Sequence, residues 1–132
     1  MLVPFVESPE ELARVSARVP VGAMVESMAG VRAARTLCER AEFVSIGTND
    51  LAASALRRPR AETRPEDALL PPVWSCIEAI VSAARELGRE VSVCGEAATV
   101  PEAIERFAEI GVDALSVSPT QWSAVARSVE VR

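Results

Sequence analysis

Four polar residues that could do chemistry directly follow short apolar runs: Glu26, Asn49, Asp50 and Cys94. Two carboxylates at neighbouring strand ends can share a Mg²⁺ ion, which takes one or two carboxylates and fills its octahedron with water and substrate oxygens. Glu26 and Asp50 suit that arrangement, and the alternative is that each only caps the helix or turn that follows it. The turn between Gly47 and Asn49 either lets the backbone approach an anion or simply joins a strand to a helix.

Arg60 and Cys94 add two further kinds of chemistry. Arg60 is one of four arginines in the proline-containing segment 57–72, and such a cluster can bind phosphate, although it more often forms a solvated face. Cys94 stands beside Gly95, where a thiol could donate a proton or attack as a nucleophile. The alternative for Cys94 is a small buried residue without a chemical role.

The composition excludes several classes of function. Among 132 residues there is no histidine and no tyrosine, which excludes Ser-His-Asp and Cys-His triads, histidine metal ligands and phosphohistidine carriers. The net charge of −5 argues against a nucleic-acid partner, and no apolar run is long enough to span a membrane. The absence of a signal peptide at the N-terminus and of any CxxC cysteine pair predicts a cytoplasmic protein.

The elements that must position these residues alternate along the chain. Five strand-like runs alternate with amphipathic helical stretches, and no hairpin signal joins them, which predicts parallel strands with right-handed crossovers. This α/β pattern fits a doubly wound sheet or part of a (β/α)8 barrel, because a whole barrel typically needs about 250 residues. We expect Trp74 and Trp122 to anchor their helices against the core. The predicted strands are residues 2–6, 21–25, 43–46, 91–93 and 114–117.

Four segments together resemble a known family, the C-terminal phosphoenolpyruvate (PEP)-binding barrel of PEP-utilising enzymes. Enzyme I of the sugar phosphotransferase system looks closest, with pyruvate phosphate dikinase and PEP synthase as relatives. The resemblance covers nearly the whole chain and implies one domain, residues 1–132, that is a partial (β/α)8 (TIM) barrel of about five parallel strand–helix units. These units would be strands four to eight of the family barrel. The segments are Met24-Val25-Glu26, Ser45-Ile46-Gly47-Thr48-Asn49-Asp50-Leu51, Val93-Cys94-Gly95-Glu96 and Leu115-Ser116-Val117-Ser118.

The resemblance assigns a role to each candidate residue. It makes Glu26 and Asp50 the Mg²⁺ ligands, and it places Asn49 and Arg60 on the phosphate of PEP. Cys94 would be the acid that protonates the enolate carbon when PEP gives up its phosphoryl group. A metal that neutralises carboxylate and phosphate oxygens, together with a nearby proton source, is consistent with these roles.

The chain also departs from the family pattern. The first three barrel strands, with the arginines that grip the PEP phosphate, and the phosphohistidine domain have no counterpart here, and Met28 stands where the family usually has a proline. We therefore expect phosphoryl transfer only with a partner that completes the barrel. An incomplete barrel leaves open strand edges, which predicts a partner chain or a homo-oligomer.

Two other functions remain as alternatives. The chain could be a non-catalytic ligand-sensing or assembly module of the same family, which the missing histidine and arginines favour over independent catalysis. It could instead be a Mg²⁺-dependent aldolase or lyase that forms a pyruvate enolate with a Glu and Asp pair. The Cys94-Gly95-Glu96 segment favours the PEP family over this last alternative.

Overall fold

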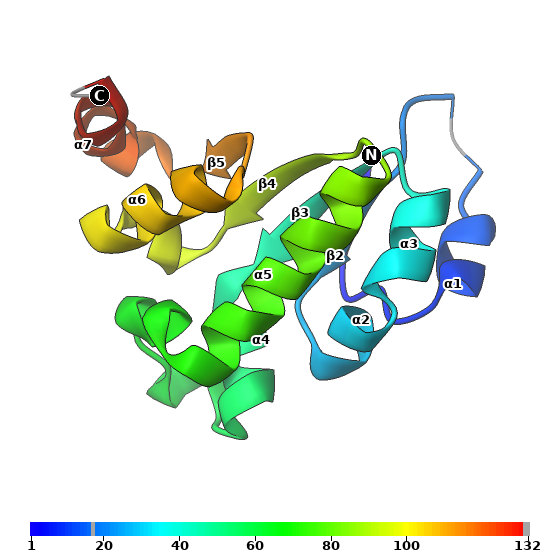
Figure 1. Cartoon of the computed structure of the whole chain (residues 1–132), viewed down its shortest axis with the longest axis horizontal. Helices are drawn as coiled ribbons and strands as arrows, with labels where there is room; N and C mark the ends of the chain where they lie inside the picture. Colours follow the sequence, from blue (N-terminus) through cyan, green and yellow to red (C-terminus); the bar gives the residue numbers. More distant parts are fainter. Residues whose placement is uncertain (17, 131–132) are drawn as a thin grey trace.

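The computed structural model describes residues 1–16 and 18–130, which form one curved parallel sheet covered by helices (Figure 1). The strand order β1-β2-β3-β4-β5 follows the sequence, and each neighbouring pair is parallel. This arrangement confirms the predicted α/β fold with five strand–helix units. The strands are β1 (Leu2–Val3), β2 (Gly22–Val25), β3 (Phe43–Gly47), β4 (Glu90–Cys94) and β5 (Ala114–Ser116).

Helices connect every strand to the next. None of the helices within the described residues combines the length and apolarity that a membrane crossing requires. The α-helices are α1 (Pro9–Ala13), α2 (Met28–Arg32), α3 (Ala34–Arg40), α4 (Thr48–Leu56), α5 (Pro71–Glu86), α6 (Pro101–Ile110) and α7 (Pro119–Glu130). Three short 3-10 helices are η1 (Arg60–Glu62), η2 (Pro65–Leu69) and η3 (Glu96–Thr99).

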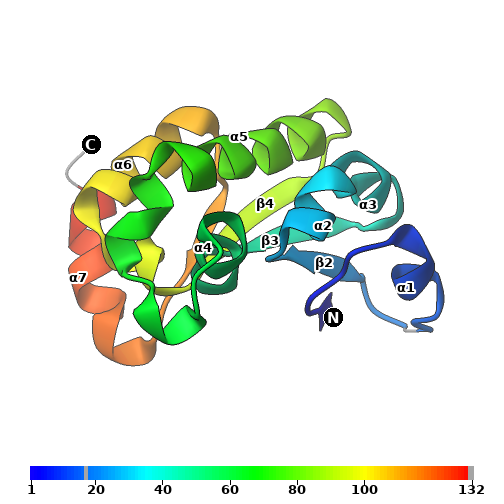
Figure 2. The same cartoon turned by 90° about the horizontal axis from the view of Figure 1, so that it is seen from below.

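The two faces of the sheet differ in character. Side chains alternate between faces along each strand, so Val44 and Ile46 of β3 point the same way as the residues paired with them, Val91 and Val93 of β4. All four are fully buried, and the helices form an arc on that outer side (Figure 2). The inner side carries small or polar residues such as Ser92, as expected for one wall of a barrel.

Helix α5 supplies the largest apolar face of the outer layer. It begins at Pro71, which suits a first helical turn because its missing N–H would have no helical partner, and it buries Ile77 and Ile80 completely. Trp74 is 6% exposed and stacks on Phe107 of α6 with ring centroids 5.7 Å apart. Trp74 is therefore a helix anchor, as predicted.

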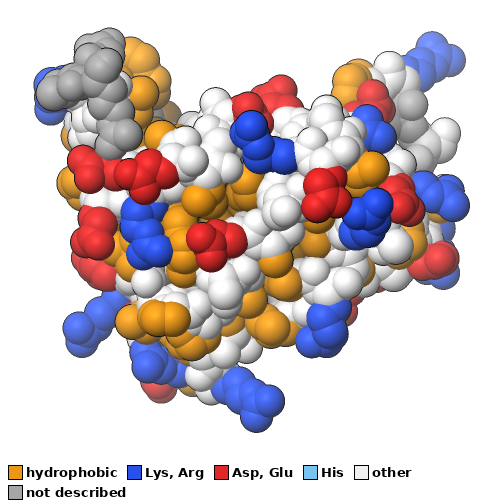
Figure 3. All heavy atoms as spheres, viewed as in Figure 1, with side chains coloured by type: hydrophobic (Ala, Val, Ile, Leu, Met, Phe, Trp, Pro, Cys, Tyr) orange, Lys and Arg blue, Asp and Glu red, His pale blue; other side chains and the backbone are white. Residues whose placement is uncertain are grey.

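Helix α7 is anchored differently from the prediction. Trp122 is 65% exposed and Val129 is 50% exposed, whereas Val125 between them is buried. The expectation that Trp122 packs against the core is wrong. Among the described elements, helix α7 has its closest contacts with α6 and η3, which leave part of its apolar stripe exposed. Hydrophobic side chains are visible on this part of the surface in Figure 3 (upper left).

Two predicted segments have different local structure. The strand expected over residues 2–6 ends at Val3, since Pro4 has no N–H to donate to the ladder. The arginine-rich segment 57–72, expected to be irregular, contains η1 and η2. Asp67 stabilises this segment, because it accepts a hydrogen bond from the Arg64 backbone N–H at 2.9 Å.

Candidate functional site

The carboxyl ends of β2, β3 and β4 enclose a cleft of about 280 Å³. All five residues singled out in the sequence line this cleft, although they come from four separate stretches of chain. The remaining lining residues come from β2, from the segment that follows β1, and from the ends of β3 and β4 with the turns after them. The lining residues are Pro4, Phe5, Met24, Glu26, Gly47, Thr48, Asn49, Asp50, Arg60, Cys94 and Gly95.

Glu26 follows β2 and is only 5% exposed. It is not a helix cap, because Ser27 caps α2 by accepting a hydrogen bond from the Gly30 N–H at 3.1 Å. The Glu26 carboxylate instead accepts a hydrogen bond from the Phe5 backbone N–H at its Oε1 (2.8 Å). A Cβ at Gly47 would lie 2.5 Å from Oε2, so the carboxylate lies against the turn that leads to Asp50.

Burial raises the pKa of Glu26 above its ordinary value. The Phe5 N–H opposes this shift, the negative charge of Asp50 adds to it, and Arg60 partly offsets it. The two carboxylates therefore repel each other in a partly buried setting. A cation between them would remove this repulsion.

Asp50 and Arg60 form an ion pair across the cleft. Asp50 lies in the first turn of α4, where a negative charge also favours the helix N-terminus. Its Oδ2 is 3.1 Å from Arg60 Nη1, and the Arg60 side chain is 63% exposed. Because exposed ion pairs contribute little stability, this contact holds the Arg60 side chain only weakly.

Backbone and side-chain hydrogen bonds fix the turns after β3 and β4 to each other. Thr48 Oγ1 donates to Cys94 O (2.9 Å), and Asn49 Oδ1 accepts from Glu96 N (2.9 Å). The group that Asn49 can offer to an anion is therefore its NH₂. Gly95 has a φ of +99°, and a Cβ there would lie 2.5 Å from Asn49 Oδ1, so only glycine fits this position.

Cys94 ends β4 with its thiol in the cleft. Burial raises its pKa, the Ser45 hydroxyl at 3.8 Å opposes that shift, and the negative charges of Glu26 and Asp50 raise the pKa further. The thiol therefore keeps its proton at neutral pH. The Sγ donates to the Ile46 carbonyl at 3.5 Å, a weak interaction that leaves the proton transferable.

The donor set at the cleft fits a magnesium ion. Within the described part of the chain, no group of three or more His, Cys, Asp or Glu side chains is placed to hold a metal. The protein would therefore supply Glu26 and Asp50 alone, and Mg²⁺ commonly takes one or two carboxylates together with water and substrate oxygens. Zinc sites, in contrast, usually have three or four protein ligands.

Sequence reasoning missed three residues that build the site: Phe5, Thr48 and Gly95. Gly95 carried a readable signal, since a glycine directly after a strand end often marks a positive φ. Thr48 and Phe5 act through contacts with residues 46 and 21 positions away, which local patterns do not reveal.

Met28, the departure from the family pattern, is the first residue of α2. Its backbone N–H donates to Ser54 Oγ of α4 at 3.0 Å. Proline is favoured at this helical position and has no N–H. In this chain the Ser54 hydroxyl therefore ties α2 to α4 through a bond that a proline could not make.

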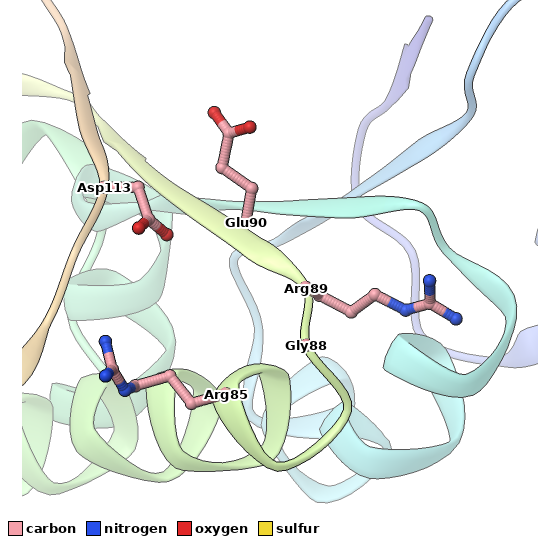
Figure 4. Close-up of a pocket in the computed structure, with 5 residues that line it drawn as sticks. All are labelled: Arg85, Gly88, Arg89, Glu90 and Asp113. Atoms are coloured by element: carbon pink, nitrogen blue, oxygen red, sulfur yellow. The ribbon is translucent and has the colours of Figure 1, made fainter.

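A larger cavity of about 540 Å³ lies at the opposite, amino ends of β4 and β5 (Figure 4). Three of its four charged side chains form hydrogen bonds with backbone atoms. Arg85 Nη1 donates to Gly111 O at 3.2 Å, and Arg89 Nε donates to Cys38 O at 2.9 Å. Asp113 Oδ2 accepts from the backbone N–H of the first buried residue of β4 at 2.8 Å. These contacts stabilise turns and strand ends.

Comparison with known sequences finds matches over nearly the whole chain. Residues 2–131 match the family described as "PEP-utilising enzyme, PEP-binding domain". A probable phosphoenolpyruvate synthase of Archaeoglobus fulgidus is 32% identical over 99% of this chain and 19% of its own length. A phosphoenolpyruvate-protein phosphotransferase of Streptomyces coelicolor is 36% identical over 76% of this chain and 18% of its own length. The chain thus spans less than a fifth of these curated relatives.

Solved structures share the fold at low sequence identity. The CitE protein of Mycobacterium tuberculosis, solved with magnesium and pyruvate, has a TM-score of 0.75 and 21% identity, over 96% of this chain and 55% of that chain. RipC of Yersinia pestis has a TM-score of 0.74 and 18% identity, over 99% of this chain and 66% of that chain. These likenesses support the partial-barrel architecture.

Proposed function

The chain belongs to the PEP-binding domain family of PEP-utilising enzymes, and from this premise we propose that its carboxyl-end cleft binds Mg²⁺ with PEP or pyruvate. The observation that carries the proposal is the convergence of a partly buried acidic pair, Glu26 and Asp50, with Arg60, Asn49 and Cys94 on one cleft. In parallel α/β folds, ligands bind at the carboxyl ends of the strands.

Each residue would have a defined task. Glu26 and Asp50 hold the cation, which when bound neutralises substrate oxygens and stabilises an enolate. Arg60 leaves Asp50 to bind the phosphate, and the Asn49 NH₂ donates to it. When the phosphorus–oxygen bond of PEP breaks and an acceptor takes the phosphoryl group, Cys94 Sγ gives its proton to C3 of the enolate, which yields pyruvate.

Phosphoryl transfer also needs groups that this chain does not contain, because its sequence has no histidine to accept the phosphoryl group. We propose that residues 1–132 act as strands four to eight of a barrel that a partner segment of three further strand–helix units completes. The exposed stripe on α7 and the apolar groove beside it, about 290 Å³, support such docking at the β5 edge. The groove is lined by Leu115, Val117, Trp122, Val125, Ala126 and Val129.

Light scattering of the isolated chain tests this partner requirement. A chain with uncovered strand edges should self-associate at micromolar concentration, with Trp122→Ser reducing the association because it removes the largest exposed apolar side chain. A well-behaved monomer would contradict this part of the proposal.

Calorimetric titration with Mg²⁺ and oxalate, a mimic of the pyruvate enolate, tests the binding function. We expect saturable binding of oxalate only when Mg²⁺ is present, and loss of that binding in Asp50→Ala. A wild-type protein that gives no heat with Mg²⁺ plus oxalate or PEP would contradict the proposal.

Hydrogen–deuterium exchange at the pyruvate methyl group tests the role of Cys94. In D₂O with Mg²⁺, at a pD high enough to populate the Cys94 thiolate, the wild type should exchange the C3 protons of pyruvate. Cys94→Ala should lose this exchange while it still binds oxalate. Binding without exchange in the wild type would favour the non-catalytic ligand-sensing module instead.

A Mg²⁺-dependent aldolase or lyase is the second candidate, because the CitE structures with magnesium and pyruvate or oxaloacetate share this fold. Such an enzyme would cleave a carbon–carbon bond of a 4-hydroxy-2-oxo acid and release pyruvate. An assay for pyruvate release from such acids separates the two candidates: release favours the lyase, and its absence, with PEP bound, favours the PEP-binding function.

A further inference from the structure

The backbone around Phe5 leaves the sheet at the edge of the cleft. Strand β1 ends at Val3, and a later backbone hydrogen bond from Val6 N–H to Met24 O (3.3 Å) brings the chain back to β2. Pro4 and Phe5 therefore lie outside the ladder. This detour places both residues in the lining of the cleft.

Phe5 has an unusual conformation for a residue with a side chain. Its φ is +50°, and among the described residues only Arg57 is another non-glycine with positive φ. Phe5 is 54% exposed, so packing of the ring does not explain the conformation. Such backbone conformations are disfavoured for most residues and cluster at functional sites.

The conformation aims the Phe5 N–H at the buried carboxylate of Glu26. The donor–acceptor distance to Oε1 is 2.8 Å, while Oε2 lies over Gly47. One carboxylate oxygen thus accepts a hydrogen bond from the segment after β1, and the other faces the turn that leads to Asp50. A hydrogen bond to a charged acceptor is among the stronger kinds.

We propose that the Phe5 backbone amide is a positioning group that orients Glu26 for the cation. This inference rests on the proposed function, since it assumes that Glu26 is a metal ligand. The amide holds Oε1 and fixes the orientation of the carboxylate, which leaves Oε2 for the metal. Partners that orient a metal ligand typically account for about 10–100-fold in metal affinity.

The test replaces the N–H without changing the side chain. A synthetic peptide of residues 1–37 with phenyllactic acid at position 5 is ligated to an expressed fragment of residues 38–132, which begins with the native Cys38. The resulting backbone ester has no donor at position 5. The matched control is an ester at Val6, which removes the hydrogen bond to Met24 O and leaves the bond to Glu26 intact.

Calorimetry with Mg²⁺ and oxalate then compares both esters with the all-amide protein, after circular dichroism has checked their folding. We expect the ester at Phe5 to weaken Mg²⁺ binding about tenfold or more, and the ester at Val6 to change it less than about twofold. If the Phe5 ester and the all-amide protein bind Mg²⁺ with equal affinity, the inference about Phe5 is overturned but the proposed function is not. An all-amide protein that binds no Mg²⁺ would overturn the proposed function.

A measurement on the unmodified chain keeps the inference testable if the Phe5 ester does not fold. In an NMR titration with Mg²⁺, the Phe5 amide resonance should shift with the same midpoint as the calorimetric affinity, because its acceptor becomes a metal ligand. A Phe5 amide that is unchanged at saturating Mg²⁺ would overturn the inference.

Discussion

The two ends of the parallel strands both carry charged cavities, but the charges are used differently. The amino-end cavity is the larger, about 540 Å³ against about 280 Å³, and its Arg85 and Asp113 are bonded to backbone atoms. At the carboxyl end, Glu26 is buried near Asp50, and its pKa is raised. The proposed function therefore rests on the cluster of interacting acids with a perturbed pKa and not on cavity size.

The largest expected effect is the loss of metal binding in Asp50→Asn. The amide keeps the shape of the side chain but has no negative charge, and the loss of a partner that merely orients a ligand already costs about 10–100-fold. We expect Mg²⁺ affinity to fall about a hundredfold or more, measured by calorimetry with oxalate. Asp113→Asn at the amino end is the matched control. An equal loss of Mg²⁺ affinity in that variant would contradict a metal site at the carboxyl end.

Arg60→Ala should separate phosphate binding from metal binding. Hydrogen bonds to charged groups contribute about 1.5–3 kcal/mol, so PEP should bind about tenfold more weakly or worse. Oxalate, which has no phosphate, should keep its Mg²⁺-dependent affinity. Arg85→Ala at the amino end should change neither, and a parallel loss of PEP and oxalate in Arg60→Ala would contradict the phosphate role.

Glu26→Gln should remove a metal ligand at the carboxyl end and raise the melting temperature of the metal-free protein. Folding raises the pKa of Glu26, so the folded protein favours the protonated carboxyl group. The stability that this group contributes is fully present below its unfolded-state pKa and is lost as pH rises through its folded-state pKa. Without Mg²⁺, Glu26→Gln should therefore melt at a higher temperature than the wild type near neutral pH. The difference should vanish below the ordinary pKa of glutamate, about 4.3.

Glu90→Gln is the amino-end control for that experiment, since Glu90 is an exposed residue of β4. Its melting temperature should follow the wild type at both pH values. The same raised pKa of Glu26 predicts that acidification weakens Mg²⁺ binding at a higher pH than an ordinary glutamate would. A melting-temperature gain in Glu26→Gln that persists at low pH would contradict this explanation.

The smallest effect is expected for Asp113→Ala. The variant loses one partly buried hydrogen bond to the Val91 N–H, and a typical hydrogen bond contributes about 0.5–1.5 kcal/mol. Chemical denaturation should show a loss of this size, with no change in Mg²⁺ affinity. A weakened Mg²⁺ affinity would show that the two ends of the strands are coupled.

The sequence predicts the meeting of Glu26, Asp50 and Cys94 because parallel strands bring their carboxyl ends to one edge of a sheet. The spacing of apolar residues likewise predicts the buried face of α5. It does not predict Phe5, since a positive φ in a residue with a side chain leaves no mark in composition or periodicity. It also misplaces Trp122, because an amphipathic pattern shows only that a helix has an apolar face and not whether this chain covers it.

The most direct measurement of the central claim is an anomalous diffraction experiment on crystals grown with Mn²⁺, which substitutes for Mg²⁺, and oxalate. The account predicts a metal peak bonded to both Glu26 and Asp50, at about 2.0–2.2 Å from one oxygen of each. No peak at this position, or a peak only beside Glu90 and Asp113 at the amino end, would contradict it.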